Sequence, residues 1–300
     1  MTAPSAAFPP PVLPGARVGI AALSGPVDPA RLAAGIRELE RLGFEPVLAA
    51  NLDRRSGLFA GAESERLRAF HDLAADPSLS AIFFARGGHG LLPILPALDW
   101  DLLAAHPRAY VGYSDLTPLL LAVVEKLRLV SLHGPMVAVD LARGLSRDEE
   151  VCLLDALAGR APAPLPVESA TADAEGVLLG GCLSLLTATL GTPFATRFDD
   201  ALLFWEDVAE PLYRIDRMLT HLDLSGNLKS IRAVIAGRVR AEDEAPASEP
   251  AVVERMRARF PGRALGWGLT AGHGTPNWTL PLGRRAALDA ASGRLVFEGS

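Results

Sequence analysis

Residues 17–133 alternate short apolar runs with amphipathic runs, and this alternation constrains the fold more than any other feature of the chain. The apolar runs, each short enough for a buried strand, cover residues 17–23, 44–49, 80–85, 108–113 and 128–133. The predicted helices cover residues 28–43, 62–77, 115–127 and 146–160. Asp28 and Pro29 are suited to begin the first of them, and Ser146 and Glu149 stand at capping-box spacing in the last. Strands that alternate with helices predict a parallel sheet, which binds ligands at the carboxyl ends of its strands.

A change of composition at residues 161–176 predicts a boundary between two domains. This segment is rich in Pro, Ala, Ser and Thr, which favours a linker. We therefore predict an N-terminal α/β domain over residues 1–160 and a C-terminal α/β domain over residues 177–300. The elements predicted in the second domain are strands at 201–207 and 231–239, a helix at 210–226 and a closing hairpin at 284–299.

The composition argues against several classes of function. The 300 residues carry a formal net charge of −6, so the chain has no basic surplus with which to neutralise nucleic acid phosphates. Its two cysteines, Cys152 and Cys182, are too few for a disulfide framework or a cysteine-based zinc site. The histidines are scattered singly along the chain. We therefore expect no metal and no nucleic acid partner.

The chain also lacks the patterns of a membrane protein or an exported protein. No stretch approaches the roughly eighteen uninterrupted apolar residues of a membrane span. Residues 1–20 are rich in proline and lack both a basic start and a long apolar run, so they predict an extended arm rather than a signal peptide. Because the cysteine content is low as well, we expect a cytoplasmic protein.

Ser114 lies between the strand predicted at 108–113 and the helix predicted at 115–127, where two roles compete. A serine before an amphipathic run usually caps the helix with its hydroxyl, and the local pattern favours this role. The same strand-to-helix turn is where a nucleophile elbow holds its serine, although Leu116 replaces the second glycine of the usual motif. In that case the amide of Asp115 is placed to donate to an oxyanion.

A glycine-rich segment at residues 86–90 directly follows the third predicted strand. Gly87 and Gly88 let the backbone approach a ligand and aim N–H groups at a negative atom. The segment matches neither the dinucleotide-binding pattern nor the phosphate-loop pattern, and a tight turn is the alternative interpretation. Arg86 is either solvated or placed to bind a carboxylate.

A nucleophilic serine needs a base, and the base needs an acid that orients it. His273 stands in a loop crowded with Gly, Thr, Pro and Asn, which suits a positioned imidazole. Glu206 ends an apolar strand, where a carboxylate has to be paired or reach water. Its competitors for the same role are Asp207, Glu210 and Asp216. His133 ends the fifth predicted strand and lies near the site if the sheet forms as predicted.

Seven short motifs, in order along nearly the whole chain, resemble those of a known family. They are SGP (24–26), ARGGHG (85–90), GYSDLTPL (112–119), HGPM (133–136), GGCLSLL (180–186), LFWEDVAEPLYRIDRML (203–219) and GHGTPNWTLPLG (272–283). The chain is similar to the LD-carboxypeptidases, a serine peptidase family. This family includes muramoyltetrapeptide carboxypeptidases and microcin C self-immunity peptidases.

The resemblance implies a fold and a set of site residues. The fold is a flavodoxin-like N-terminal domain with a smaller C-terminal α/β domain, with the active site between them and a homodimer as the usual assembly. The implied nucleophile, acid and base are Ser114, Glu206 and His273. The amides of Asp115 and Gly88 would form the oxyanion hole. The family requires no metal or organic cofactor.

The implied reaction releases the terminal D-alanine of a murein tetrapeptide across an L,D bond, through an acyl-enzyme, in peptidoglycan recycling. The substrate would be a free muropeptide in the cytoplasm. Arg86 and Gly87 are candidates for binding it, with Arg86 facing the carboxylate of D-alanine. Two departures from the family pattern bear on the substrate: His89 replaces a common tyrosine, and Cys182 replaces a common asparagine.

Three alternatives compete with this reaction. A microcin C-type immunity peptidase would cleave a peptidyl or aminoacyl nucleotide, but such relatives usually have a longer chain and an extra aromatic loop, whereas aromatic residues make up only 6% here. A catalytically silent muropeptide-binding protein has no reason to retain Ser114, Glu206 and His273. A generic nucleotide-binding domain is disfavoured because the phosphate-loop patterns are missing.

Overall fold

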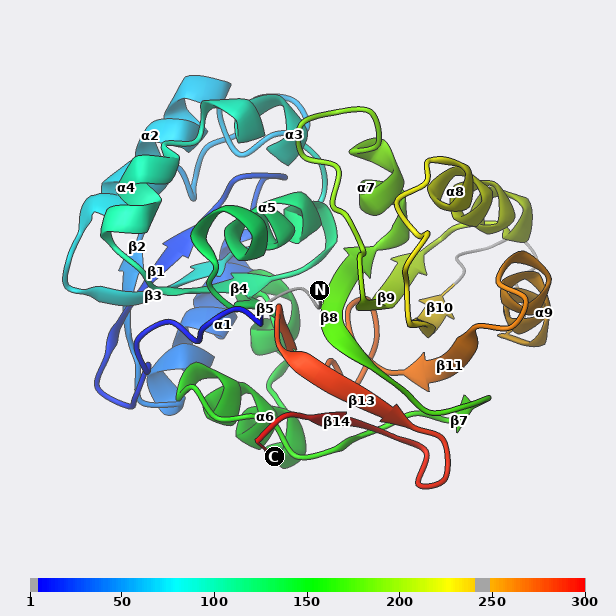
Figure 1. Cartoon of the computed structure of the whole chain (residues 1–300). Helices are drawn as coiled ribbons and strands as arrows, with labels where there is room; N and C mark the ends of the chain where they lie inside the picture. Colours follow the sequence, from blue (N-terminus) through cyan, green and yellow to red (C-terminus); the bar gives the residue numbers. More distant parts are fainter. Residues whose placement is uncertain (1–4, 241–248, 300) are drawn as a thin grey trace.

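The computed structural model describes residues 5–240 and 249–299, which form two β-sheets (Figure 1). The first sheet has the order β12-β5-β4-β3-β1-β2. Its strands are β1 (Arg17–Ala21), β2 (Glu45–Leu48), β3 (Leu79–Phe84), β4 (Ala109–Gly112), β5 (Ser131–His133) and β12 (Leu280–Leu282). Strands β1 to β5 are parallel, whereas β12 is antiparallel to β5. The parallel sheet predicted from the first half of the chain is confirmed, and four of its five parallel strands are shorter than predicted.

Two helices of the first half begin where the capping signals predict. Helix α1 (Pro29–Arg41) follows Asp28, whose carboxylate accepts the amide of Arg31 at 2.8 Å. Helix α6 (Arg147–Leu157) begins at the capping box of Ser146 and Glu149. The other helical segments of this half are α2 (Glu63–Ala75), α3 (Leu91–Ile94), η1 (Leu95–Ala97), α4 (Trp100–Ala105), η2 (Ser114–Leu116), α5 (Thr117–Ala122), η3 (Val123–Leu127) and η4 (Val137–Leu141).

The single helix predicted over residues 115–127 is wrong, because the structure divides this stretch into η2, α5 and η3. Pro118 has no N–H to donate to the carbonyl of Ser114, so a regular α-helix cannot run through this position from residue 115. Helix α5 instead has Pro118 in its first turn, where the missing N–H costs nothing. The stretch ends in the π-helical turn η3, and Arg128 leaves it in the left-handed region.

The second sheet has the order β6-β14-β13-β8-β9-β10-β11-β7. Its strands are β6 (Leu165–Pro166), β7 (Ser169–Ala170), β8 (Ala174–Cys182), β9 (Ala201–Val208), β10 (Ala233–Arg240), β11 (Ala264–Leu269), β13 (Arg285–Asp289) and β14 (Arg294–Phe297). Strands β8 to β11 are parallel, and β13 and β14 form the predicted closing hairpin. The helices of this half are α7 (Leu183–Ala188), α8 (Leu212–Leu224) and α9 (Glu249–Arg259).

The segment predicted as a linker has more structure than its composition indicates. Residues 161–176 contain β6 and β7, which lie at opposite edges of the second sheet, and the start of β8. Leu165 and Val167 are buried in the hydrophobic core, and the burial of these apolar side chains explains why the Pro-rich segment is packed against the sheet.

Strand β12 carries the C-terminal half of the chain back to the first sheet. The chain leaves the second sheet at the end of β11, passes through residues 270–279 and then pairs with β5 in the first sheet. The loop that contains His273 therefore bridges the two sheets. The buried apolar side chains of both sheets form one contiguous core, so the two halves are packed together around this loop. Among the described residues, no helix is long and apolar enough to cross a membrane.

Candidate active site

Ser114 stands two residues beyond the end of β4, at the carboxyl edge of the first sheet, and is the first residue of η2. Its φ of 63° places it in the left-handed region, which is uncommon for a residue with a side chain. Its Oγ lies 3.1 Å from Nε2 of His273, and no side-chain cap is found at the start of η2 or of α5. The local prediction that Ser114 caps a helix is therefore wrong.

His273 lies in the loop between β11 and β12, and both of its imidazole nitrogens are engaged. Nε2 faces Ser114, while Nδ1 lies 2.8 Å from Oε2 of Glu206, which also accepts the backbone N–H of His273 at 3.0 Å. Burial lowers the pKa of His273, but the Glu206 carboxylate outweighs this effect and leaves the pKa raised above its ordinary value. The serine hydroxyl can donate to Nε2 when Nδ1 carries the proton that Glu206 accepts.

Glu206 lies in the C-terminal part of β9 and is fully buried. Burial raises the pKa of its carboxyl, but the charge and hydrogen bonds of His273 outweigh this, so the pKa is lowered and the group is ionised. Gly272 makes room for it: a Cβ at that position would lie 2.3 Å from the carboxyl carbon of Glu206, and the residue has a φ of 87°. Only glycine fits this approach without displacement of the acid.

The competing acids lie elsewhere. Asp207 accepts the amides of Ser184 and Val208, at 2.8 and 2.9 Å. Glu210, whose side chain is mostly buried, pairs with the exposed Arg214 at 2.7 Å. Asp216 lies on α8. Of these carboxylates, none has a hydrogen bond or ion pair with His273 among the described residues, so Glu206 is the carboxylate that contacts this imidazole.

The glycine-rich segment lies directly against Ser114. A Cβ at Gly87 would lie 2.8 Å from the serine Oγ and 3.3 Å from the amide nitrogen of Asp115, so a side chain there would crowd the hydroxyl. Gly88 follows with a φ of 115° and packs on Gly25. The side chain of Asp115 is occupied by the amide of Leu91 at 2.9 Å, which leaves its own backbone amide as the group next to Ser114.

A cavity of about 240 Å³ opens beside Ser114. It is lined by Asp28, Arg31, Arg86, Gly87, Gly88, Tyr113, Ser114, Met136, Ala138, Val139 and His273. The lining therefore holds two cations, Arg31 and Arg86, and one carboxylate, Asp28, and the rest of it is largely apolar. Arg86 donates to the carbonyl of Pro26 at 3.2 Å, while the side chain of Arg31 has no hydrogen bond or ion pair to a described residue.

Two family models match this chain over most of its length. The LD-carboxypeptidase N-terminal domain matches residues 18–134, and the LD-carboxypeptidase C-terminal domain matches residues 175–288. The chain belongs to the LD-carboxypeptidase family. Its resemblance to that family is thus confirmed, and with it the assignment to the serine-type carboxypeptidases, which are hydrolases.

Relatives of this LD-carboxypeptidase agree over nearly its full length. It is 34% identical to a Bacillus subtilis protein named probable murein peptide carboxypeptidase, across 95% of this chain and 92% of the relative. The solved muramoyltetrapeptide carboxypeptidase of Oxalobacter formigenes is 30% identical, covers 94% of this chain and 97% of its own, and superposes with a TM-score of 0.83. The microcin C7 self-immunity protein MccF of Escherichia coli is 26% identical, across 85% of this chain and 84% of the relative.

Several residues around the site are not evident from the sequence. Asn277 fixes the His273 loop: its side-chain Oδ1 accepts the backbone N–H of Gly272 at 2.7 Å, and its backbone N–H donates to the carboxylate of Glu149 at 2.8 Å. The ring of Tyr113 meets the imidazole of His273 edge-on at 5.1 Å. Asn277 lies in the family motif at residues 272–283, so the sequence could have indicated that it belongs to the site. Its partner Glu149 is 128 positions away, and no local pattern connects the two.

The two departures from the family pattern lie outside this cavity. His89 is exposed, and its ring centroid is 5.7 Å from that of Phe59. Cys182 is buried, and its amide donates to Oγ1 of Thr117 at 3.1 Å. Burial raises the pKa of the Cys182 thiol well above its ordinary value, which keeps it protonated and unreactive. In the described ranges, no group of three His, Cys, Asp or Glu side chains could hold a metal ion.

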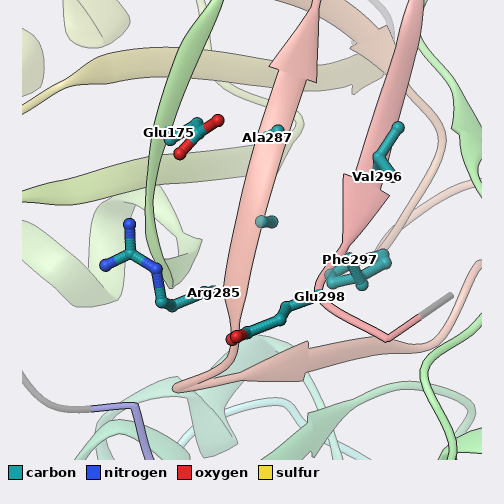
Figure 2. Close-up of a pocket in the computed structure, with 7 residues that line it drawn as sticks. Glu175, Arg285, Ala287, Val296, Phe297 and Glu298 are labelled. Carbon is teal, nitrogen blue, oxygen red and sulfur yellow. The ribbon is translucent and has the colours of Figure 1, made fainter.

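A second cavity, of about 250 Å³, lies along β8, β13 and β14 (Figure 2). It is lined by Glu175, Arg285, Ala286, Ala287, Val296, Phe297 and Glu298. The lining holds no serine, cysteine or histidine and shares no residue with the cavity beside Ser114. We therefore place the candidate chemistry at Ser114.

Proposed function

We propose that this LD-carboxypeptidase releases the terminal D-alanine of a murein tetrapeptide, with Ser114 as nucleophile, His273 as base and Glu206 as the orienting acid. The observation that carries the proposal is the unbroken chain of contacts from Ser114 Oγ to His273 and on to Glu206, at 3.1 and 2.8 Å. Such a chain makes a serine hydroxyl nucleophilic at neutral pH. The names of the murein peptide carboxypeptidase relatives support the substrate class.

The reaction proceeds in two balanced steps. His273 Nε2 takes the hydroxyl proton while Ser114 Oγ attacks the carbonyl carbon of the L-configured centre. The C–N bond then breaks, and the amine of D-alanine leaves with that proton. Water next attacks the acyl-enzyme while His273 takes one of its protons. The ester bond then breaks, Ser114 Oγ recovers that proton from His273, and the shortened peptide leaves with a new carboxylate. The amides of Asp115 and Gly88 would stabilise the oxyanion, which fits their position beside Ser114.

A carboxypeptidase has to recognise the free carboxylate of its terminal residue. Arg86, with the less accessible Gly87 beside it, and Arg31 are the groups that we propose for this task. Both guanidinium groups line the cavity that opens on Ser114, and the apolar lining of Met136 and Ala138 suits the small methyl group of D-alanine. A guanidinium binds a carboxylate through two parallel hydrogen bonds, which also orients the scissile bond.

We further propose that the enzyme acts on free muropeptides in the cytoplasm, as its sequence patterns indicate, and works as a homodimer, as its family resemblance implies. Tyr213 and Leu224 of α8 are exposed apolar side chains that a partner subunit could cover. Neither proposal changes the chemistry at Ser114.

A microcin C-type substrate is the second candidate, because MccF matches this chain over most of its length. A nucleotide base usually needs an aromatic platform on which to stack. Among the described residues that line the cavity beside Ser114, Tyr113 is the one tyrosine, tryptophan or phenylalanine, and it already packs on His273. This lining favours the peptide substrate over the nucleotide one.

One experiment separates these candidates. The purified protein is incubated with a sugar-free tetrapeptide that ends in D-alanine, and in parallel with an aminoacyl sulfamoyl nucleoside, while the release of each product is followed. We expect D-alanine release by the wild type and none by Ser114→Ala. No release from the tetrapeptide by the wild type would refute the substrate. Release that persists in Ser114→Ala would refute the mechanism, and a wild type inert with both compounds would favour a silent binding protein.

A further inference from the structure

The two oxygens of Glu206 have different surroundings. Oε2 accepts both the Nδ1–H and the backbone N–H of His273. Oε1 is buried as well, yet it has no hydrogen-bond partner among the described residues. A buried ionised oxygen without a partner is costly, so what faces Oε1 bears directly on how the acid is held.

His133 is the side chain that faces this oxygen. It ends β5, is fully buried, and its Nε2 lies 4.0 Å from Oε1 of Glu206. This separation is longer than a hydrogen bond, and it is shorter than the roughly 4.6 Å that two bonds through an intervening water would span. Neither ring nitrogen of His133 has a hydrogen-bond partner among the described residues. The unpartnered imidazole and the unpartnered oxygen therefore meet each other directly.

The ring of His133 is held in place by its neighbours. The ring of Phe204 meets it edge-on at 5.4 Å, and the ring of Tyr113 lies 5.7 Å away. Strand β5 is fixed on both sides, since His133 is in register with Gly112 of β4 and with Leu280 of β12. Burial lowers the pKa of His133 to about 4, although the Glu206 carboxylate works in the opposite direction. The imidazole is therefore neutral at pH 7 and carries one proton.

We propose that His133 is a positioning residue for the acid, with its single proton on Nε2 directed at Oε1 of Glu206. The N–H dipole offsets part of the cost of the buried carboxylate and fixes its rotation, so that Oε2 stays aligned on Nδ1 of His273. The line of groups then runs from Ser114 through His273 and Glu206 to His133. In a bound complex the 4.0 Å contact has room to shorten into a hydrogen bond. This inference rests on the proposed roles of Ser114, His273 and Glu206, not on the identity of the peptide.

Two substitutions test the proposal because they separate the N–H donor from the volume of the side chain. His133→Gln can place an amide N–H near the position of Nε2, whereas His133→Leu fills the space without a donor. We expect His133→Leu to lower kcat about tenfold or more with KM changed less than about threefold, because the acid is misaligned rather than the substrate. His133→Gln should restore kcat to within about threefold of the wild type.

The pH profile of kcat/KM gives a readout that a packing role would not move. The charged and titratable groups that act on this site are Asp140, Asp207, Tyr113, Cys182, His133 and Glu206 itself. Without the Nε2–H dipole, less of the negative charge on Glu206 is offset. That charge should then stabilise protonated His273 more strongly and raise the pKa of His273. The acidic limb should therefore move to higher pH in His133→Leu and stay near the wild-type position in His133→Gln.

The control is Ser131→Ala, two residues earlier on the same buried strand. Its hydroxyl donates to the carbonyl of Leu120, and within the described part of the chain it has no hydrogen bond to Ser114, His273 or Glu206. We expect lower thermal stability with an unchanged kcat and pH profile. Labelling of Ser114 by a fluorophosphonate probe is measured alongside peptide cleavage, so that nucleophile activation is read without any assumption about the substrate. If the probe labels the wild type but no D-alanine is released, the proposed substrate is wrong and the inference about His133 still stands.

Three results would overturn the positioning role. The first is a folded His133→Leu variant with wild-type kcat and labelling rate. The second is a His133→Gln variant as impaired as His133→Leu, since the donor would then not matter. The third is an acidic limb that stays in place in His133→Leu. If His133→Leu fails to fold, the activity and pH profile of His133→Gln still decide, because a loss of kcat in that folded variant contradicts the proposal.

Discussion

The two sides of His273 have opposite surroundings. On the Nε2 side, Ser114 is half-buried and faces a cavity of about 240 Å³ with two arginines on its lining. On the Nδ1 side, Glu206 and His133 are fully buried among strands of both sheets. The difference follows from the tasks proposed for the two sides. A nucleophile has to meet a substrate, whereas a carboxylate orients and charges an imidazole most strongly where water is excluded.

Removal of the charge on the buried side should have the largest effect. In Glu206→Gln the carboxylate that raises the pKa of His273 is gone, so that pKa should fall. We expect kcat to drop by about 10³–10⁴-fold and the acidic limb of kcat/KM to move to lower pH. In the wild type the same limb should lie above pH 6.5, because the pKa of His273 is raised from that value. A full pH–rate profile of both proteins checks the sign, and a limb that stays in place would mean that Glu206 does not set the pKa of the base.

The second largest loss of activity is expected when a side chain is added beside Glu206, on the Nδ1 side of His273. In Gly272→Ala the new methyl group would overlap the carboxyl of Glu206, and the residue would be strained at its φ of 87°. Displacement of the acid by about 1 Å should lower kcat about 10²-fold. Gly274→Ala, two residues further along the loop, is the matched control, because a Cβ there would have no atom of the described residues within 4 Å, its chain neighbours aside. Steady-state kinetics should show the loss in the first variant only, and equal losses would instead point to general loop damage.

Substitutions on the open side should have smaller and substrate-dependent effects. Arg31→Ala and Arg86→Ala should each slow cleavage of a tetrapeptide with a free terminal carboxylate by about 10–100-fold, the value of a charge-assisted hydrogen bond. Cleavage of the matching D-alaninamide peptide should change little, because it has no carboxylate to lose. The control is Arg37→Ala, because Arg37 lies on α1 with Arg31 but does not line the cavity. An equal loss with acid and amide would show that the arginine does not bind the carboxylate.

The smallest effect is expected for Glu210, a carboxylate that was a candidate for the orienting acid from the sequence but is not paired with His273. Glu210 is mostly buried and pairs with Arg214, and among the described residues it has no hydrogen bond or ion pair with His273. Glu210→Gln should therefore keep kcat/KM within about threefold of the wild type, with the pH profile unchanged. A loss comparable to that of Glu206→Gln would reopen the choice of the acid.

The sequence predicts the regular parts of this molecule well because their signals are local. The apolar runs predict the strands of the parallel sheet, and Asp28 and the Ser146–Glu149 pair predict two helix starts. Residue patterns alone left the choice between Glu206 and its acidic competitors open, and only the family motifs selected Glu206. The same local rules failed at Ser114, because a positive φ and a contact 159 positions away are invisible in the residues next to it.

What the sequence could not predict depends on contacts between distant segments. Strand β12 has three residues, and its pairing with β5 is decided by the packing of both sheets. The two edge strands in the segment predicted as a linker form because apolar residues such as Leu165 find a core to join. Arg31 has the pattern of an ordinary exposed helix residue, and only the fold brings it to the cavity that opens on Ser114. The domain limits predicted at residues 160 and 177 stay a prediction.

The return of β12 to the first sheet has a consequence for protein engineering. A chimera joined within residues 161–176 would take its nucleophile from one parent and its base from the other. It would also insert the β12 of the second parent beside the β5 of the first. The loop that carries His273 is tied at both ends, to β11 in one sheet and to β12 in the other. A functional chimera of these two halves therefore needs side chains of β5 and β12 that pack together across the strand pair, as well as compatible catalytic residues.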